Sequence, residues 1–228
     1  MARPTDSVRV YLELGSKRTF AGSIDWPGWC RSGRDEASAL AALAEYGKRY
    51  ARILRTAGLG FQAPDVAAFS VVERLKGDAT TDFGAPAMTP SSDARPITED
   101  ELRRMQAILR ACWRGFDKAV EAAEGKELRK GPRGGGRDLR QIIRHVTEAD
   151  IAYLGRLGWK YEPGDDEGSA QEVARVRRSI LSALGSYAPT DKPAKGPRGG
   201  VRWWPRYFVR RVAWHALDHA WEIEDRFI

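Results

Sequence analysis

The segment RWWPRYFVRRVAWHALDHAWEIEDR, residues 202–226, contains two of the three histidines in this 228-residue chain. His215 and His219 are four residues apart, which places both side chains on one face of an α-helix with their Cβ atoms about 5–6 Å apart. Pro205, a residue type favoured in the first turn of a helix, marks where this helix begins. Two neutral imidazoles in this arrangement can bind one metal ion, although two buried core histidines would have the same spacing.

The third histidine, His145, lies in a second amphipathic segment that predicts a helix from about Asp138 to Leu157. In an up-down-up-down bundle the second and fourth helices run in the same direction and begin at the same end. At 1.5 Å per residue, His145 then lies about 12 Å along its helix, and His215 and His219 lie about 15 and 21 Å along theirs. We therefore predict that the three imidazoles bind one metal ion.

Two capping boxes predict the starts of the two remaining helices of this half of the chain. Thr98-x-x-Glu101 and Ser169-x-x-Glu172 each pair a hydroxyl with a carboxylate that can satisfy backbone N–H groups. Apolar residues recur every three or four positions behind each box, as they do on the buried face of a helix. Four such helices of about 20 residues predict a four-helix bundle over residues 97–228.

The amino-terminal part has a different pattern. Val8–Leu14 alternates apolar and polar residues, and together with Thr19–Ile24 it predicts a β-hairpin. A helix is expected from about Asp35 to Thr56, followed by a closing strand at Phe69–Leu75. Residues 1–77 therefore predict a small α+β module.

Residues 78–96, DATTDFGAPAMTPSSDARP, contain three prolines and follow neither a helical nor a strand period. Such a segment is typical of a linker or a long loop. We therefore expect three parts: an α+β module at 1–77, a linker at 78–96 and a four-helix bundle at 97–228. The fold class of the whole chain is then α+β.

Composition excludes several classes of protein. The chain has 38 Lys and Arg against 31 Asp and Glu, a net charge of +7, but the basic residues are spread evenly and argue against a nucleic-acid partner. It has no apolar run of the roughly 20 residues that a membrane helix needs, and no apolar signal-peptide core. Two cysteines cannot build a disulfide framework. We therefore expect a cytoplasmic protein.

Two helical segments, GRDLRQIIRHVTEADIAYLGRLG (136–158) and the quoted 202–226, resemble the DinB superfamily of metal-binding four-helix bundles. In that family one His of the second helix and a His-x-x-x-His pair of the last helix bind a divalent metal, usually zinc or nickel. The resemblance implies this role for His145, His215 and His219. Several members are transferases or isomerases that use a low-molecular-weight thiol such as mycothiol or bacillithiol. It thus implies a metal-dependent, thiol-using enzyme that acts on a small molecule.

The segment Asp25-Trp26-Pro27-Gly28-Trp29-Cys30 resembles the turn between strand and helix in HicB-like domains. HicB antitoxins commonly add a DNA-binding domain, whereas this chain continues into the expected bundle. We therefore expect a module for packing, homodimerisation or covering the substrate. Two other functions stay open: a non-catalytic stress protein that binds a metal or small ligand, and a HicB-type regulator acting through a protein or nucleic-acid partner.

Two carboxylates are candidates for orienting a metal-bound imidazole. Glu148 follows His145 by three residues, and Glu222 follows His215 by seven, so each returns to nearly the same helical face as a histidine. A carboxylate that accepts the second ring N–H of a ligand histidine fixes its orientation. Either residue could equally be an ordinary surface carboxylate in a salt bridge.

Several cations are candidates for binding an anionic substrate near the metal. Arg211 lies one helical turn before His215. The sequence KGPRGG occurs at 130–135 and again at 195–200, before the two helices that carry histidines, and contributes Lys130, Arg133, Lys195 and Arg198. These residues would attract an anion to the pocket mouth. The alternative is that both copies are only flexible connectors.

Overall fold

The computed structural model describes residues 7–130, 136–164, 168–186 and 202–226. The chain divides into two compact units, Met1–Arg95 and Pro96–Ile228. The first contains the β-sheet and the second contains four long helices, so the predicted α+β class is confirmed. Within the described ranges, every helix is too short or too polar to cross a membrane.

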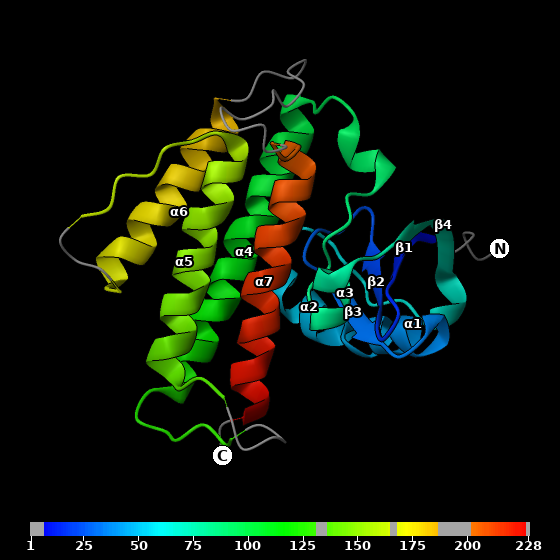
Figure 1. Cartoon of the computed structure of the whole chain (residues 1–228), viewed down its shortest axis with the longest axis horizontal. Helices are drawn as coiled ribbons and strands as arrows, with labels where there is room; N and C mark the ends of the chain where they lie inside the picture. Colours follow the sequence, from blue (N-terminus) through cyan, green and yellow to red (C-terminus); the bar gives the residue numbers. More distant parts are fainter. Residues whose placement is uncertain (1–6, 131–135, 165–167, 187–201, 227–228) are drawn as a thin grey trace. The chain divides into compact units, whose positions relative to one another are not determined.

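The first unit is built on a four-stranded mixed sheet with the order β3-β2-β1-β4 (Figure 1). Strands β1 and β2 form the predicted antiparallel hairpin, β2 pairs antiparallel with β3, and β1 pairs parallel with β4. In the register of the hairpin, Leu12 lies opposite Ala21. The strands span β1 (Val8–Leu14), β2 (Thr19–Ser23), β3 (Cys30–Gly33) and β4 (Phe69–Lys76). The strand β3 was not predicted, because four residues are too few to show a period.

The single helix expected over 35–56 is divided into α1 (Glu36–Glu45) and α2 (Gly47–Arg55). The division follows from packing at Gly47, where an added Cβ would lie 3.1 Å from the Cβ of Ala63 and 3.5 Å from the Trp29 ring. A larger residue at 47 would require Ala63 to shift, so glycine suits this close approach of the helix to the core.

The turn after β2 is held by the aromatic core of the first unit. Trp29 is fully buried, stacks on Tyr50 with 6.0 Å between ring centroids, and donates its indole N–H to the carbonyl of Leu43. The Tyr50 hydroxyl donates to the carbonyl of Pro27 at 2.8 Å. The DWPGWC segment is therefore locked between α1 and α2, each of its two contacts satisfying a buried polar group.

Residues 78–96, expected to form a linker or a long loop, contain short helical elements, and the boundary between the two units lies near their end, after Arg95. They contain α3 (Ala79–Phe83) and a 3-10 turn, η2 (Ser91–Ala94), preceded in the chain by a similar turn, η1 (Val66–Ala68). The fully buried carboxylate of Glu13 on β1 accepts hydrogen bonds from the Thr81 hydroxyl and from the N–H groups of Ala87 and Met88. A buried charge requires such partners, and this requirement packs a segment without periodicity onto the sheet.

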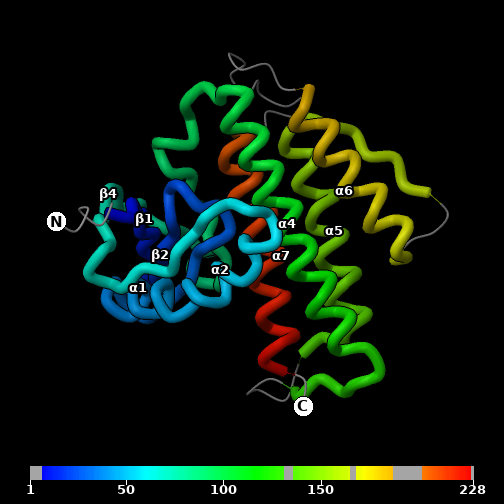
Figure 2. Tube along the Cα trace, turned by 180° about the vertical axis from the view of Figure 1, so that it is seen from behind, coloured from blue at the N-terminus to red at the C-terminus, as the bar shows by residue number. Residues whose placement is uncertain are grey.

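The second unit contains four long helices that pack side by side (Figures 1 and 2). They are α4 (Glu99–Ala123), α5 (Leu139–Leu157), α6 (Ala170–Gly185) and α7 (Pro205–Arg226). The Thr98 capping box begins α4 as predicted. Ser169 caps α6 by accepting from the N–H of Glu172, and the carboxylate of Glu172 accepts from the N–H of Gly168.

The up-down-up-down order is wrong, because α5 and α7 are antiparallel. The backbone N–H of Trp203, just before α7, donates to the carbonyl of Arg156 near the end of α5 at 2.9 Å. At the opposite end, Arg226 donates to the carbonyl of Arg137 just before α5, also at 2.9 Å. Both views show α6 running in the same direction as α5. The connection 158–169 is long enough for this return, since an extended chain spans about 3.3 Å per residue.

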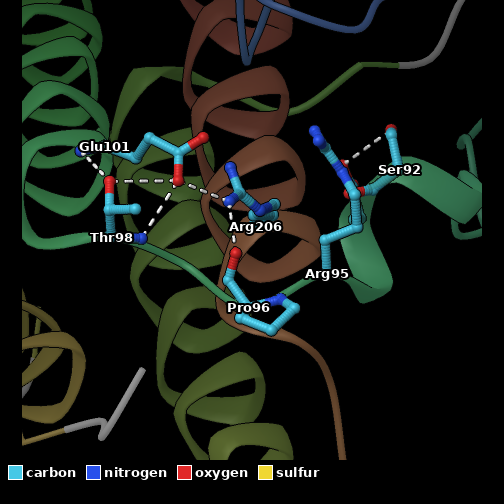
Figure 3. A network of polar contacts seen from close by, with 7 residues as sticks. Ser92, Arg95, Pro96, Thr98, Glu101 and Arg206 are labelled. Atoms are coloured by element: carbon cyan, nitrogen blue, oxygen red, sulfur yellow. Dashed lines mark hydrogen bonds and ion pairs between the residues drawn. The ribbon is translucent and has the colours of Figure 1, made fainter. Parts of the chain in front are cut away.

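The helices α4 and α7 run in the same direction, and a polar network joins their first turns (Figure 3). Arg206 donates to the carboxylate of Glu101 at 2.7 Å and to the carbonyl of Pro96 at 2.8 Å. The Glu101 carboxylate also accepts from the N–H of Thr98. The Arg206 guanidinium, followed by Thr98, lowers the pKa of Glu101 to about 2. The capping box therefore also aligns α7.

Candidate metal centre

His145, His215 and His219 come together between α5 and α7. Their candidate ligand atoms all lie within 4.8 Å of one another, and the Nε2 atoms of His145 and His215 are 3.2 Å apart. The reason differs from the one predicted. Because the helices are antiparallel, His145 near the start of α5 lies level with His215 and His219 toward the end of α7. The predicted residues meet although the predicted helix direction is wrong.

Glu222 fixes the orientation of one ring. Its Oε2 lies 2.7 Å from Nδ1 of His219. Burial raises the pKa of Glu222, but hydrogen bonds and charge from His219 and Arg226 outweigh it and leave the pKa below its usual value. An ionised carboxylate can only accept, so the proton of a neutral His219 is on Nδ1. The lone pair of Nε2 is then available on the other side of the ring.

Two of the three histidines, His145 and His215, favour the neutral form of the imidazole. Burial lowers the pKa of His215 well below its usual value, and the charges of His219 and His145 lower it further. Burial, followed by the charge of Arg137, also lowers the pKa of His145. The neutral ring is the form of histidine that binds metals.

The distances suit a divalent metal ion. Two nitrogens bound tetrahedrally to zinc at about 2.0–2.1 Å lie about 3.3 Å apart, close to the 3.2 Å between His145 and His215. A hydrogen bond between these two rings would explain that distance, but it would not explain the third ring nitrogen within 4.8 Å. Three nitrogen donors leave at least one coordination position for another ligand, which is the pattern of catalytic rather than structural sites.

The other predicted carboxylate, Glu148, has its described hydrogen bond with an arginine of its own helix. Glu148 accepts from Nε of Arg144 at 2.8 Å, and both side chains are more than half exposed. The charge of Glu148 also acts on His145, whose pKa it raises against the larger effect of burial. Of the two candidate carboxylates, Glu222 is the one with a described hydrogen bond to a histidine of the cluster.

Arg211 lies beside the cluster in an aromatic setting. Its guanidinium lies 4.8 Å from the ring centroid of Trp214 and 5.6 Å from that of Tyr153. The Tyr153 ring in turn contacts His215, with 5.9 Å between centroids. Burial raises the pKa of Tyr153, whereas the charge and hydrogen bond of Arg211 lower it. Of the other predicted cations, Lys130 is exposed at the end of the described range 7–130, and Arg133, Lys195 and Arg198 lie outside the described residues.

Sequence reasoning missed two residues of this region. Tyr153 is not among the predicted site residues, although it lies eight residues after His145 and so on a nearby face. Arg226 was not considered, although it follows Glu222 by four residues and pairs with it at 2.5 Å. The i,i+4 spacing of opposite charges is a pattern that could have identified Arg226.

Comparison with protein-family models, with curated proteins and with solved structures gives no significant match to this chain. The assignment of the site therefore depends on its own geometry and chemistry.

Proposed function

We propose that the protein binds one divalent metal ion, zinc or nickel, through His145, His215 and His219. The observation that carries this proposal is the convergence of three ring nitrogens within 4.8 Å, where burial lowers the pKa of His145 and His215. The hydrogen bond from His219 to Glu222 adds the outer partner that a ligand histidine usually has. We also propose that the second unit is a DinB-like four-helix bundle and that the first unit is a HicB-like module.

We further propose that the site is catalytic and uses a low-molecular-weight thiol in a transfer or isomerisation reaction on a small molecule. A divalent metal held by three neutral ligands acts as a Lewis acid on a thiol, a water or a substrate oxygen. The chain's own residues bind and orient the substrate. Arg211, half-buried beside Trp214 and Tyr153, offers a guanidinium for a carboxylate or phosphate group one turn from His215.

Elemental analysis of the full chain, purified without a histidine tag, tests the metal site. We expect close to one divalent ion per chain, and a strong reduction in His215→Ala. Ile180→Ala is the matched control, because it removes a fully buried side chain from α6 without removing a ligand. It should lower stability and retain the metal. Undiminished metal in a variant with all three histidines changed to alanine would overturn the proposal.

The catalytic part is tested separately by incubating the metal-loaded protein with a thiol and a set of small electrophiles. We expect turnover that needs both the metal and the thiol and that weakens in Arg211→Met for anionic substrates. Retained metal without turnover of any substrate in the set would favour the non-catalytic metal-binding alternative.

A further inference from the structure

Arg226, the last residue of α7, directs its guanidinium at three acceptors that come from different parts of the second unit. Nη1 lies 2.5 Å from the carboxylate of Glu222, Nε donates to the carbonyl of Arg129 at 2.9 Å, and Nη2 donates to the carbonyl of Arg137 at 2.9 Å. The side chain is only 13% exposed. Each of the three guanidinium nitrogens therefore has an acceptor, unlike a typical exposed ion pair, which contributes little to stability.

The surrounding backbone is shaped to hold this side chain. Arg129 returns two hydrogen bonds to the end of α7: its N–H donates to the carbonyl of Arg226 at 2.8 Å, and its Nη2 donates to that of Asp225 at 2.7 Å. Gly136 has φ +145°, and a Cβ at this position would lie 2.6 Å from Nη2 of Arg226. A side chain at residue 136 would therefore displace the guanidinium.

Two acceptors of Arg226 are connected to histidines of the cluster: Glu222 contacts His219, and Arg137 lies at the start of the helix that carries His145. Glu222 accepts from Nδ1 of His219, so a fixed Glu222 keeps Nε2 of that ring free for a metal. Arg137 immediately precedes Asp138, the residue that caps α5, and α5 carries His145. One guanidinium thus holds both the orienting partner of His219 and the start of the helix that carries His145.

We infer that Arg226 is a positioning residue of the metal centre, which holds Glu222 against His219 and ties α7 to the start of α5. This inference rests on the proposed function, since it concerns the same three histidines. Lysine cannot replace arginine here, because an ammonium group is a point charge and lacks the planar fork that reaches three acceptors at once.

The first test uses the metal-free full chain, so that it does not depend on metal binding. Nitrogen NMR of the imidazoles should show His219 with its proton on Nδ1 in the wild type. In Arg226→Met that preference should fall, because Glu222 is no longer held in place. Arg177→Met is the matched control: Arg177 is 17% exposed and pairs with Asp117 at 2.8 Å, but has no contact described with the histidines or Glu222. It should leave His219 unchanged.

The second test measures the affinity of the same proteins for Co²⁺, whose absorption spectrum reports its ligands. Replacing outer partners of ligand histidines costs about 10–100-fold in affinity, and we expect about tenfold for Arg226→Met and no change for Arg177→Met. Arg226→Lys should recover only part of the loss. In Glu222→Ala, the further change of Arg226 should cost less than it does in the wild type, because the two residues act on the same ring.

The outcomes separate the two proposals. If the wild type takes up no Co²⁺, the proposed function and this inference both fail. If the wild type binds Co²⁺ and Arg226→Met binds it equally well with an unchanged His219 proton, only the role of Arg226 is wrong. Equal losses of affinity in Arg226→Met and Arg177→Met would also overturn it, since general destabilisation would then explain both.

Discussion

Each unit of the molecule holds ionisable side chains away from solvent, one carboxylate in the first unit and three imidazoles in the second, and the two groups differ in how their hydrogen bonds are completed. The carboxylate of Glu13 in the first unit accepts from Thr81, Ala87 and Met88, so the chain itself satisfies it. In the second unit, Nδ1 of His215 is buried without a hydrogen-bond partner among the described residues, and three ring nitrogens face one another. The Glu13 carboxylate is structural, whereas the three ring nitrogens have the spacing of a site that could hold a metal ion.

The largest change in the free energy of unfolding is expected for a substitution of Glu13. Glu13→Ala leaves a buried hydroxyl and two half-buried N–H groups without their acceptor, at about 1–3 kcal/mol each, and should lower the free energy of unfolding by about 3–5 kcal/mol. Chemical denaturation measures this loss, which should be the same with and without metal. Glu73→Ala is the control, because Glu73 holds Ser91 of the same segment from an exposed position and should cost far less. Equal losses in the two variants would contradict a structural role for the burial of Glu13.

Added metal should raise the stability of the protein through the histidine cluster. A ligand that binds only the folded state stabilises it by about 2.7 kcal/mol at roughly 100 times its Kd. Zinc added to chelator-treated protein should therefore raise the unfolding temperature, and a chelator should reverse the increase. In His215→Ala the shift should disappear, whereas in Glu13→Ala it should keep its size. A zinc-induced shift that survives in His215→Ala would place the metal elsewhere.

A third buried group, Asp150 on α5, should make stability depend on pH. Burial raises the pKa of this carboxyl to about 7, although the charge of Arg177 opposes the shift. Between the unfolded value near 3.8 and about 7, the folded state holds a proton that the unfolded chain has released, so stability falls as pH rises. From pH 6 to pH 8 the expected loss is about 1.4 kcal/mol.

Denaturation of metal-free wild type and Asp150→Asn at the two pH values isolates this contribution, because the histidines titrate in both proteins. Asp150→Asn should lose about 1.4 kcal/mol less than the wild type between pH 6 and pH 8. Identical pH dependence in the two proteins would show that Asp150 is ionised in the folded state throughout this range.

The smallest change in stability is expected for Glu148→Ala, which is compared with Glu222→Ala. Glu148→Ala removes an exposed i,i+4 pair with Arg144 and should change the free energy of unfolding by only about 0.3–0.5 kcal/mol. Its Co²⁺ affinity should match that of the wild type, whereas Glu222→Ala should weaken binding about 10–100-fold. A comparable loss of affinity in Glu148→Ala would mean that Glu148 also supports the metal centre.

Residues close in sequence were predictable because their structure depends on local chemistry. The alternation in Val8–Leu14 is that of a half-buried strand, and the hydroxyl of Thr98 caps a helix wherever that helix packs. The i,i+4 spacing alone places His215 and His219 on one face. Glu222 was predicted as a partner of a histidine for the same reason, and it lies three residues after His219 on the same helix.

The sequence by itself thus determined the strand at Val8–Leu14, the helix starts and the pairing of His215 with His219, because each depends on neighbours within a few residues. Only the tertiary structure decided that α5 and α7 are antiparallel, that residues 78–96 pack onto the sheet around Glu13, and that Arg226 reaches Arg129 and Arg137. The physical reason is that periodicity specifies which face of an element is buried but not its direction. Direction depends on contacts between residues far apart in the chain and on the length of the connections between them.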